Sequence, residues 1–233
     1  MTHQLTAHQR ALVVQVESIL DDRSHLEFML EEGGDEVLTA ADFRVFIDTF
    51  KEDAKSILIS LFCEIHGISI ETAQNLLLHA AAEFKVSHRN ISQMIRDYGE
   101  LINHSYPEQQ NGSLPLHIAC AAAGREHRLR LEAFMIPFPQ AVKIPDINNV
   151  TSLQIALIHG ADVDVIKMLV DSYRPALMKP FLPNTTTSDL EPLVGMLPFH
   201  IACCRSRWLD VIYQILVESQ SDVICRITNR QLP

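Results

Sequence analysis

The 233-residue sequence is short of basic residues and has no long apolar run. Lys and Arg together number 19, against 29 Asp and Glu, so the formal net charge is −10. We therefore expect no nucleic-acid ligand, because binding to a phosphate backbone requires clustered Lys and Arg. No stretch of about 18 apolar residues occurs, so we expect no membrane span.

The N-terminal sequence lacks the basic and apolar regions of a signal peptide. The cysteines are odd in number: Cys63, Cys120, Cys203, Cys204 and Cys225. An odd set without a secretion signal indicates reduced, intracellular thiols. We expect a cytoplasmic protein, and a nuclear one fits the same features.

The patterns that carry catalysis are also missing. No Ser lies in a Gly-x-Ser-x-Gly turn, and no glycine-rich loop is suited to phosphate. His117 and Cys120 are three residues apart, as are His200 and Cys203, and such pairs can share a helix face. Zinc requires four ligands, however, and the two pairs lie in distant parts of the chain. We expect no enzyme activity, no metal and no cofactor.

What the sequence does contain is a repeated motif. Asn111-Gly-Ser-Leu-Pro-Leu-His-Ile-Ala-Cys120 returns as Val194-Gly-Met-Leu-Pro-Phe-His-Ile-Ala-Cys203, and weaker copies lie at 149–157 and 75–81. The alanines that close the copies, Ala81, Ala119, Ala156 and Ala202, are 38, 37 and 46 residues apart. This spacing is typical of a helical array.

Each part of the motif has a structural interpretation. Gly112 and Gly195 stand where a turn requires positive φ, and Asn149 takes the same place in the third copy. Pro115 and Pro198 suit the first position of a helix, where the missing N–H costs nothing. A second apolar helix follows each motif, at 91–102, 129–135, 163–170 and 209–217. We expect Cys120 and Cys203 to be buried, since free Cys is often a small core residue.

The motif resembles that of ankyrin repeats, whose signature is T-P-L-H-x-A at a period of about 33 residues. Leu114 and Leu197 replace the Thr, which removes a hydroxyl N-cap worth about 1 kcal/mol. This leucine variant is similar to divergent ankyrin arrays of unicellular algae and related protists. The resemblance implies an all-α, ankyrin-type solenoid of helical hairpins, and protein–protein recognition by its concave surface. It also implies that the motif His hydrogen-bonds the backbone of a turn.

We divide the chain into an N-terminal helical segment, 1–67, and a repeat array, 68–233. The segment consists of two helices, at 1–32 and 39–65, that either cap the open end of the array or form a separate docking module. The first helix begins with a capping box at Thr6–Gln9, and Ser69 caps the first repeat. The repeats span 68–107, 108–147, 148–192 and 193–227, and residues 228–233 begin another.

An inserted loop, 179–192, lengthens the third repeat. Long loops in compact arrays are usually functional or disordered. Within it, Ser188-Asp-Leu-Glu191 is either a local capping box or an acidic-directed phosphorylation site.

The residues expected to contact a protein partner lie in the turn tips, the first helices and the Trp-containing turn of the last repeat. Trp208 there either covers the core edge or is a binding residue. The tips and first helices contribute Gln110, Asn111, Ser113, Asn148, Asn149, Val150, Val194, Met196, Ala122, Ala123, Ile158, His159, Cys204 and Arg205, and the last turn contributes Arg207 and Trp208.

The chain stops at Pro233, which aligns with Pro115 of the motif. We therefore expect a fragment of a longer array, with self-association through an uncapped C-terminal repeat. The alternative function is that of a regulatory or targeting piece of a larger multidomain protein.

Overall fold

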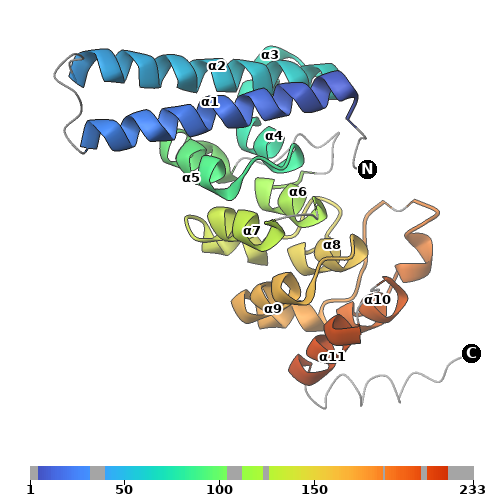
Figure 1. Cartoon of the computed structure of the whole chain (residues 1–233). Helices are drawn as coiled ribbons and strands as arrows, with labels where there is room; N and C mark the ends of the chain where they lie inside the picture. The colour runs from blue at the N-terminus through green and yellow to red at the C-terminus, as the bar shows by residue number, and fades with distance from the viewer. Residues whose placement is uncertain are drawn as a thin grey trace, which may run out of the picture. The chain divides into compact units, whose positions relative to one another are not determined.

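The computed structural model describes residues 5–31, 40–103, 112–122, 126–185, 187–205 and 209–219. Across these ranges all regular structure is helical and no strand occurs, so the prediction of an all-α fold is confirmed (Figure 1). The chain forms two compact units, residues 1–104 and 105–233. The boundary that we predicted between the N-terminal segment and the repeat array, at 67/68, was based on the register of the repeats. It stays a prediction.

The first unit contains two long helices and a group of shorter ones. The elements are α1 (Ala7–Glu31), α2 (Ala40–His66), α3 (Ile70–Gln74), α4 (Leu77–Glu83), α5 (His88–Asp97) and the 3-10 helix η1 (Gly99–Asn103). Helices α1 and α2 lie side by side, α2 packs on α3 and α4, and α1 packs on α5 (Figure 1). The two N-terminal helices therefore cover the first predicted repeat.

Local capping residues set the starts of two of these helices. Thr6 Oγ1 accepts from the Gln9 N–H, and the Gln9 side chain accepts from the Thr6 N–H, which is the predicted capping box. Ser69 accepts from the Thr72 N–H at the start of α3, also as predicted.

The helix predicted at 91–102 is wrong in its extent. Helix α5 ends at Asp97, Tyr98 leaves the helical conformation, and η1 begins at Gly99. A glycine inside a helix costs about 1 kcal/mol relative to alanine, so the break falls where helix continuation is weakest.

Buried polar contacts hold α1 against α5. The Arg23 guanidinium forms two hydrogen bonds with the Asp97 carboxylate, at 2.5 and 3.1 Å. Glu17 accepts from the Ser87 N–H and from the Asn90 amide, so it also helps to cap α5. These charge-assisted bonds fix the register between two elements that are about 70 residues apart.

In its described residues, the second unit repeats a pair of helices, and a 3-10 helix follows each of the first two pairs. Its elements are α6 (Pro115–Ala121), α7 (His127–Met135), η3 (Pro139–Lys143), α8 (Ser152–Ile158), α9 (Val163–Ser172), η4 (Arg174–Met178), η5 (Glu191–Leu193), α10 (Pro198–Arg205) and α11 (Leu209–Glu218). Three hairpins result, α6/α7, α8/α9 and α10/α11. Helix α8 packs between α6 and α10, and α9 packs between α7 and α11 (Figure 1).

The turn before each hairpin adopts the backbone conformation predicted from the motif. Gly112, Asn149 and Gly195 all have positive φ, at +54°, +62° and +79°. Gly112 must also be small, because a Cβ there would lie 2.8 Å from the Ile147 Cβ. Pro115 and Pro198 are the first residues of α6 and α10, as predicted.

A buried side chain near the start of α6, and another near the start of α8, joins each helix to the far end of its own repeat. His117 Nδ1 accepts from the Leu114 N–H at 3.0 Å, and Nε2 bonds the Ile144 carbonyl at 2.9 Å. Gln154 makes the same pair, since Oε1 accepts from the Thr151 N–H and Nε2 donates to the Lys179 carbonyl. Ile144 and Lys179 are the C-caps of η3 and η4, so the two repeats share this connection.

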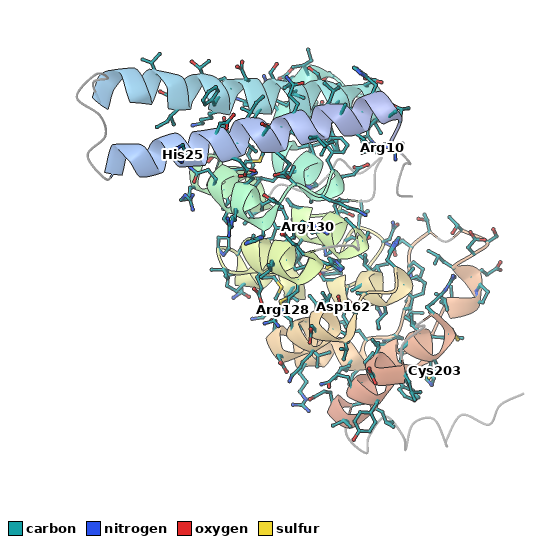
Figure 2. All side chains as sticks on the ribbon, in the orientation of Figure 1. Arg10, His25, Arg128, Arg130, Asp162 and Cys203 are labelled. Atoms are coloured by element: carbon teal, nitrogen blue, oxygen red, sulfur yellow. The ribbon has the colours of Figure 1, made fainter. Side chains whose placement is uncertain are left out.

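The prediction that both motif cysteines are buried is half wrong. Cys120 is fully buried. Cys203, labelled on α10 in Figure 2, is exposed. The residue in the same place on α6 is covered by α8, whereas within the described ranges no further first helix stacks on α10. Burial of the motif cysteine thus depends on a neighbouring helix, not on the motif itself.

We predict that His117→Ala will lower the free energy of unfolding by about 2–4 kcal/mol, because two buried backbone groups lose their partner. His117→Gln should lose less than about 1 kcal/mol, since Gln154 already performs this role in the next repeat. Denaturant unfolding of both variants measures the difference. Equal losses would show that the hydrogen bonds are not what His117 contributes.

Acid should lower the free energy of unfolding of the wild type more than that of the His117→Gln variant. Burial lowers the pKa of His117 from 6.5 to about 4, although the bond to Ile144 opposes this. Between these values the unfolded chain binds the proton and the folded chain does not, so stability falls as the pH falls from 6.5 towards 4. This group accounts for up to about 3 kcal/mol. Unfolding curves at both pH values, compared between the two proteins, isolate it, and parallel losses would contradict the assignment.

Candidate functional site: the insertion face

The turn at 146–150 forms the tip of the third repeat and is closed at both ends. The Asp146 N–H donates to the Val150 carbonyl at 3.0 Å, and the Asp146 carboxylate accepts from the Val150 N–H at 2.8 Å. Partial burial raises the pKa of Asp146, while the hydrogen bonds that it accepts from the backbone oppose the shift. Asn149 stands at the exposed, positive-φ position of this turn.

The inserted loop leaves and re-enters the repeat at a short base. Phe181 is buried, and its N–H donates to the Met196 carbonyl at 2.8 Å. The Gly195 N–H donates back to the Phe181 carbonyl at 2.7 Å. An apolar anchor and two backbone bonds therefore bring together the two ends of a segment about a dozen residues long.

Beyond this base the loop packs on the tip. The Asn184 N–H donates to the Asn148 carbonyl at 3.1 Å, and the Asn184 amide donates to the Ile147 carbonyl. The Thr185 hydroxyl donates to the Asn148 side-chain oxygen at 2.9 Å. Asn149 Nδ2 donates to the Leu182 carbonyl at 3.4 Å. The insertion thus extends the tip of the third repeat.

The returning part of the loop reaches the last hairpin. The Thr187 carbonyl accepts from the N–H groups of Leu190 and Glu191, which forms the turn before η5. The side chain of Arg205, at the end of α10, donates to the Asp189 carbonyl. The insertion face is the surface formed by 147–149, 182–185, 187–191 and Arg205.

The capping box predicted at Ser188–Glu191 is wrong. Helix η5 has Leu190 as its N-cap and no capping bond from a side chain, and a backbone carbonyl receives the Glu191 N–H. The alternative for this pattern, a phosphorylation site, stays a prediction.

The insertion face contains several of the residues expected to bind a partner. Asn149 and Arg205 are exposed, and Asn148 is half-buried, as is Met196 at the base of the insertion. His159, just after the end of α8, and Cys204, on α10, are exposed elsewhere, and Val194 is exposed just after η5. The helical hairpins bring these residues to the turn ends and the first helices.

Three predicted contact residues are not on the surface. Ser113 is buried, and so are Val150 and Ala122. Ser113 and Val150 each follow the positive-φ residue of their turn by one position. Ile158 is half-buried. Five predicted residues fall outside the described part of the chain: Gln110, Asn111, Ala123, Arg207 and Trp208.

Sequence reasoning missed the contact between the insertion and the tip. It treated the loop as a separate element, whereas Asn184 and Thr185 bind residues 37 positions earlier. The sequence signal that existed was Phe181, an aromatic residue between two prolines in an otherwise polar loop. Such a residue is usually buried, so it marks an anchor.

The groups on the insertion face are amides, hydroxyls, carboxylates and one guanidinium. Over the described ranges no cluster of His, Cys, Asp and Glu could hold a metal ion, and no helix there is long and apolar enough to cross a membrane. The face offers hydrogen bonds and small apolar contacts. Comparisons of the chain with protein-family models, curated proteins and solved structures find no match.

Removing the side-chain hydrogen bonds between the inserted loop and the tip should expose the loop backbone to solvent. Asn184→Ala combined with Thr185→Val removes two side-chain bonds to 147–148, each worth about 0.5–1.5 kcal/mol. We expect amide exchange across 182–185 to accelerate by about tenfold or more, while global stability changes little. Hydrogen-exchange mass spectrometry measures this, with Ser188→Ala as the control in the same loop. Unchanged exchange in the double variant would show that other contacts hold the loop.

Proposed function

We propose that residues 105–233 form an ankyrin-like array that binds a protein partner through the insertion face. The observation that supports this most directly is the register of the three hairpins. Each begins with a positive-φ turn residue, and the first two share the same pair of hydrogen bonds from His117 or Gln154 to the end of the repeat. Stacked hairpins of this kind present a rigid row of turns.

The composition of the insertion face suits protein recognition. Leu182 is an exposed apolar side chain of this face. The face also carries hydrogen-bonding groups on Asn149, Asn184 and Arg205. Apolar contacts within a polar surround are typical of protein interfaces. The backbone beneath is held by the bonds at 181–196 and 146–150, so little conformational freedom is lost on binding.

The insertion distinguishes this surface from a plain row of turns. The inserted loop packs on the tip of the third repeat at 148, and its returning part is bonded to α10 by Arg205. We infer that the partner contacts the loop and the tip together.

We predict that Arg205→Glu combined with Asn149→Lys will lower the affinity for a captured partner by about tenfold or more. Both side chains lie on the insertion face. Lys167→Glu, on the exposed outer side of α9, is the matched charge-reversal control and should change little. Photo-crosslinkers at 149 and 167, followed by affinity capture from the cell of origin, provide the measurement. Equal crosslinking from both positions, or equal losses from both variants, would defeat the proposal.

A further inference from the structure

The hydroxyl-x-x-acid pattern of the inserted loop is not unique in the chain. A Ser or Thr with an Asp or Glu three residues later occurs at Ser18, Ser24, Thr39, Thr49, Ser105, Thr186, Ser188 and Ser219. The pattern alone therefore does not identify a phosphorylation site. The surroundings of each copy separate them.

Most of the described copies lie where a kinase cannot use them. A kinase must bring the hydroxyl into line with the γ-phosphate of ATP, and it reads the flanking residues from an unwound segment. Ser18 and Ser24 lie within α1, and Thr49 lies within α2. Ser219 is buried, and its hydroxyl donates to a backbone carbonyl of α11. The copies outside the described ranges are Thr39, Ser105 and Thr186.

Ser188 is the described copy whose side chain is exposed outside an α-helix. Its hydroxyl has no partner among the described residues, whereas the Thr185 hydroxyl donates to Asn148. Helix η5 has Leu190 as its N-cap, so Ser188 does not cap it. The Ser188 hydroxyl therefore has no structural role that phosphorylation would disrupt.

The acidic residues beside Ser188 are also available. Asp189 and Glu191 are exposed, and neither forms an ion pair with a described residue. Carboxylates elsewhere in this unit are paired, as Glu218 is with Arg174. Exposed carboxylates at the first and third positions after the hydroxyl are complementary to a basic substrate cleft.

The segment around Ser188 can unwind without disturbing the hairpins. The Thr187 carbonyl accepts from the Leu190 and Glu191 N–H groups, so these backbone bonds join residues only three or four apart. Buried Phe181 and Leu193 anchor the chain on either side. A short turn between two anchors belongs to the part of a fold that opens locally at low cost.

A cation lies beside the position that the phosphate would take. The Arg205 side chain, at the end of α10, donates to the carbonyl of Asp189, the residue that follows Ser188. A phosphoserine carries a charge of about −1.5 to −2 and accepts paired bonds from a guanidinium, so it is a stronger partner than a neutral carbonyl. Asp189 and Glu191 repel the phosphate, which leaves Arg205 as its counter-ion in the described surroundings.

We propose that Ser188 is phosphorylated by an acid-directed serine/threonine kinase and that Arg205 then binds the phosphate. Ser188 Oγ attacks the γ-phosphorus of ATP, the bond from that phosphorus to the β-phosphate oxygen breaks, and ADP leaves. The hydroxyl proton passes to the catalytic Asp of the kinase. This inference goes beyond the proposed partner binding, and its test does not use the partner.

The first experiment incubates the full chain with a purified acid-directed serine/threonine kinase and Mg-ATP, and maps the phosphate by tandem mass spectrometry. We expect phosphate on Ser188 and its loss in Ser188→Ala. Glu191→Gln keeps the hydroxyl but should lower kcat/KM by about tenfold or more, because a charged contact with the kinase is lost. Ser18→Ala, at an exposed serine of the same pattern inside α1, is the matched control and should change nothing.

The second experiment tests the role of Arg205 by phosphorus NMR of the phosphorylated chain. Arg205→Gln should raise the second pKa of the phosphate by about 0.2–0.7, because the guanidinium favours the doubly charged form. Lys167→Gln removes an exposed cation of α9 and should leave this pKa unchanged.

Two results would overturn the site itself: phosphate found at Thr186 or within the helices but not at Ser188, or a Glu191→Gln variant that is phosphorylated as fast as the wild type. An equal phosphate pKa in the wild type and Arg205→Gln would overturn the contact with Arg205. None of these results depends on whether the insertion face binds a protein partner.

Discussion

The second unit depends on a buried polar side chain at the start of each of two very short helices. Helices α6 and α8 have seven residues each, and isolated helices shorter than about 12–15 residues are marginal in water. His117 and Gln154 each hold the first turn of their helix and bind the carbonyl that ends the same repeat. Tertiary hydrogen bonds therefore supply stability that helix length does not.

The same connection sets the position of the turns. Because His117 fixes Ile144 and Gln154 fixes Lys179, the segments that lead into the next turns start from defined points. Gly112 then packs directly on Ile147 of the following turn. A tip held in this way can receive the inserted loop through backbone carbonyls at 147 and 148. The insertion face is thus a consequence of the repeat geometry.

Repetition also makes departures from the pattern informative. Helices α9 and α11 occupy the same place in successive hairpins, yet one presents Lys167 and Asp171 to solvent and the other Tyr213 and Val217. Leu169 and Ile215 occupy the same buried position, whereas Val170 is buried and its counterpart Leu216 is 36% exposed.

The sequence alone determined the local features of the fold. The positive φ of Asn149, the helix start at Pro115 and the capping box at Thr6 each follow from rules that act within about four residues. Burial does not follow from such rules, because it depends on which distant segment packs against a residue. Cys120 and Cys203 share a motif, yet only the first is covered by a following helix. The contact of the insertion with the tip likewise joins residues 37 positions apart, so only the tertiary structure could decide it.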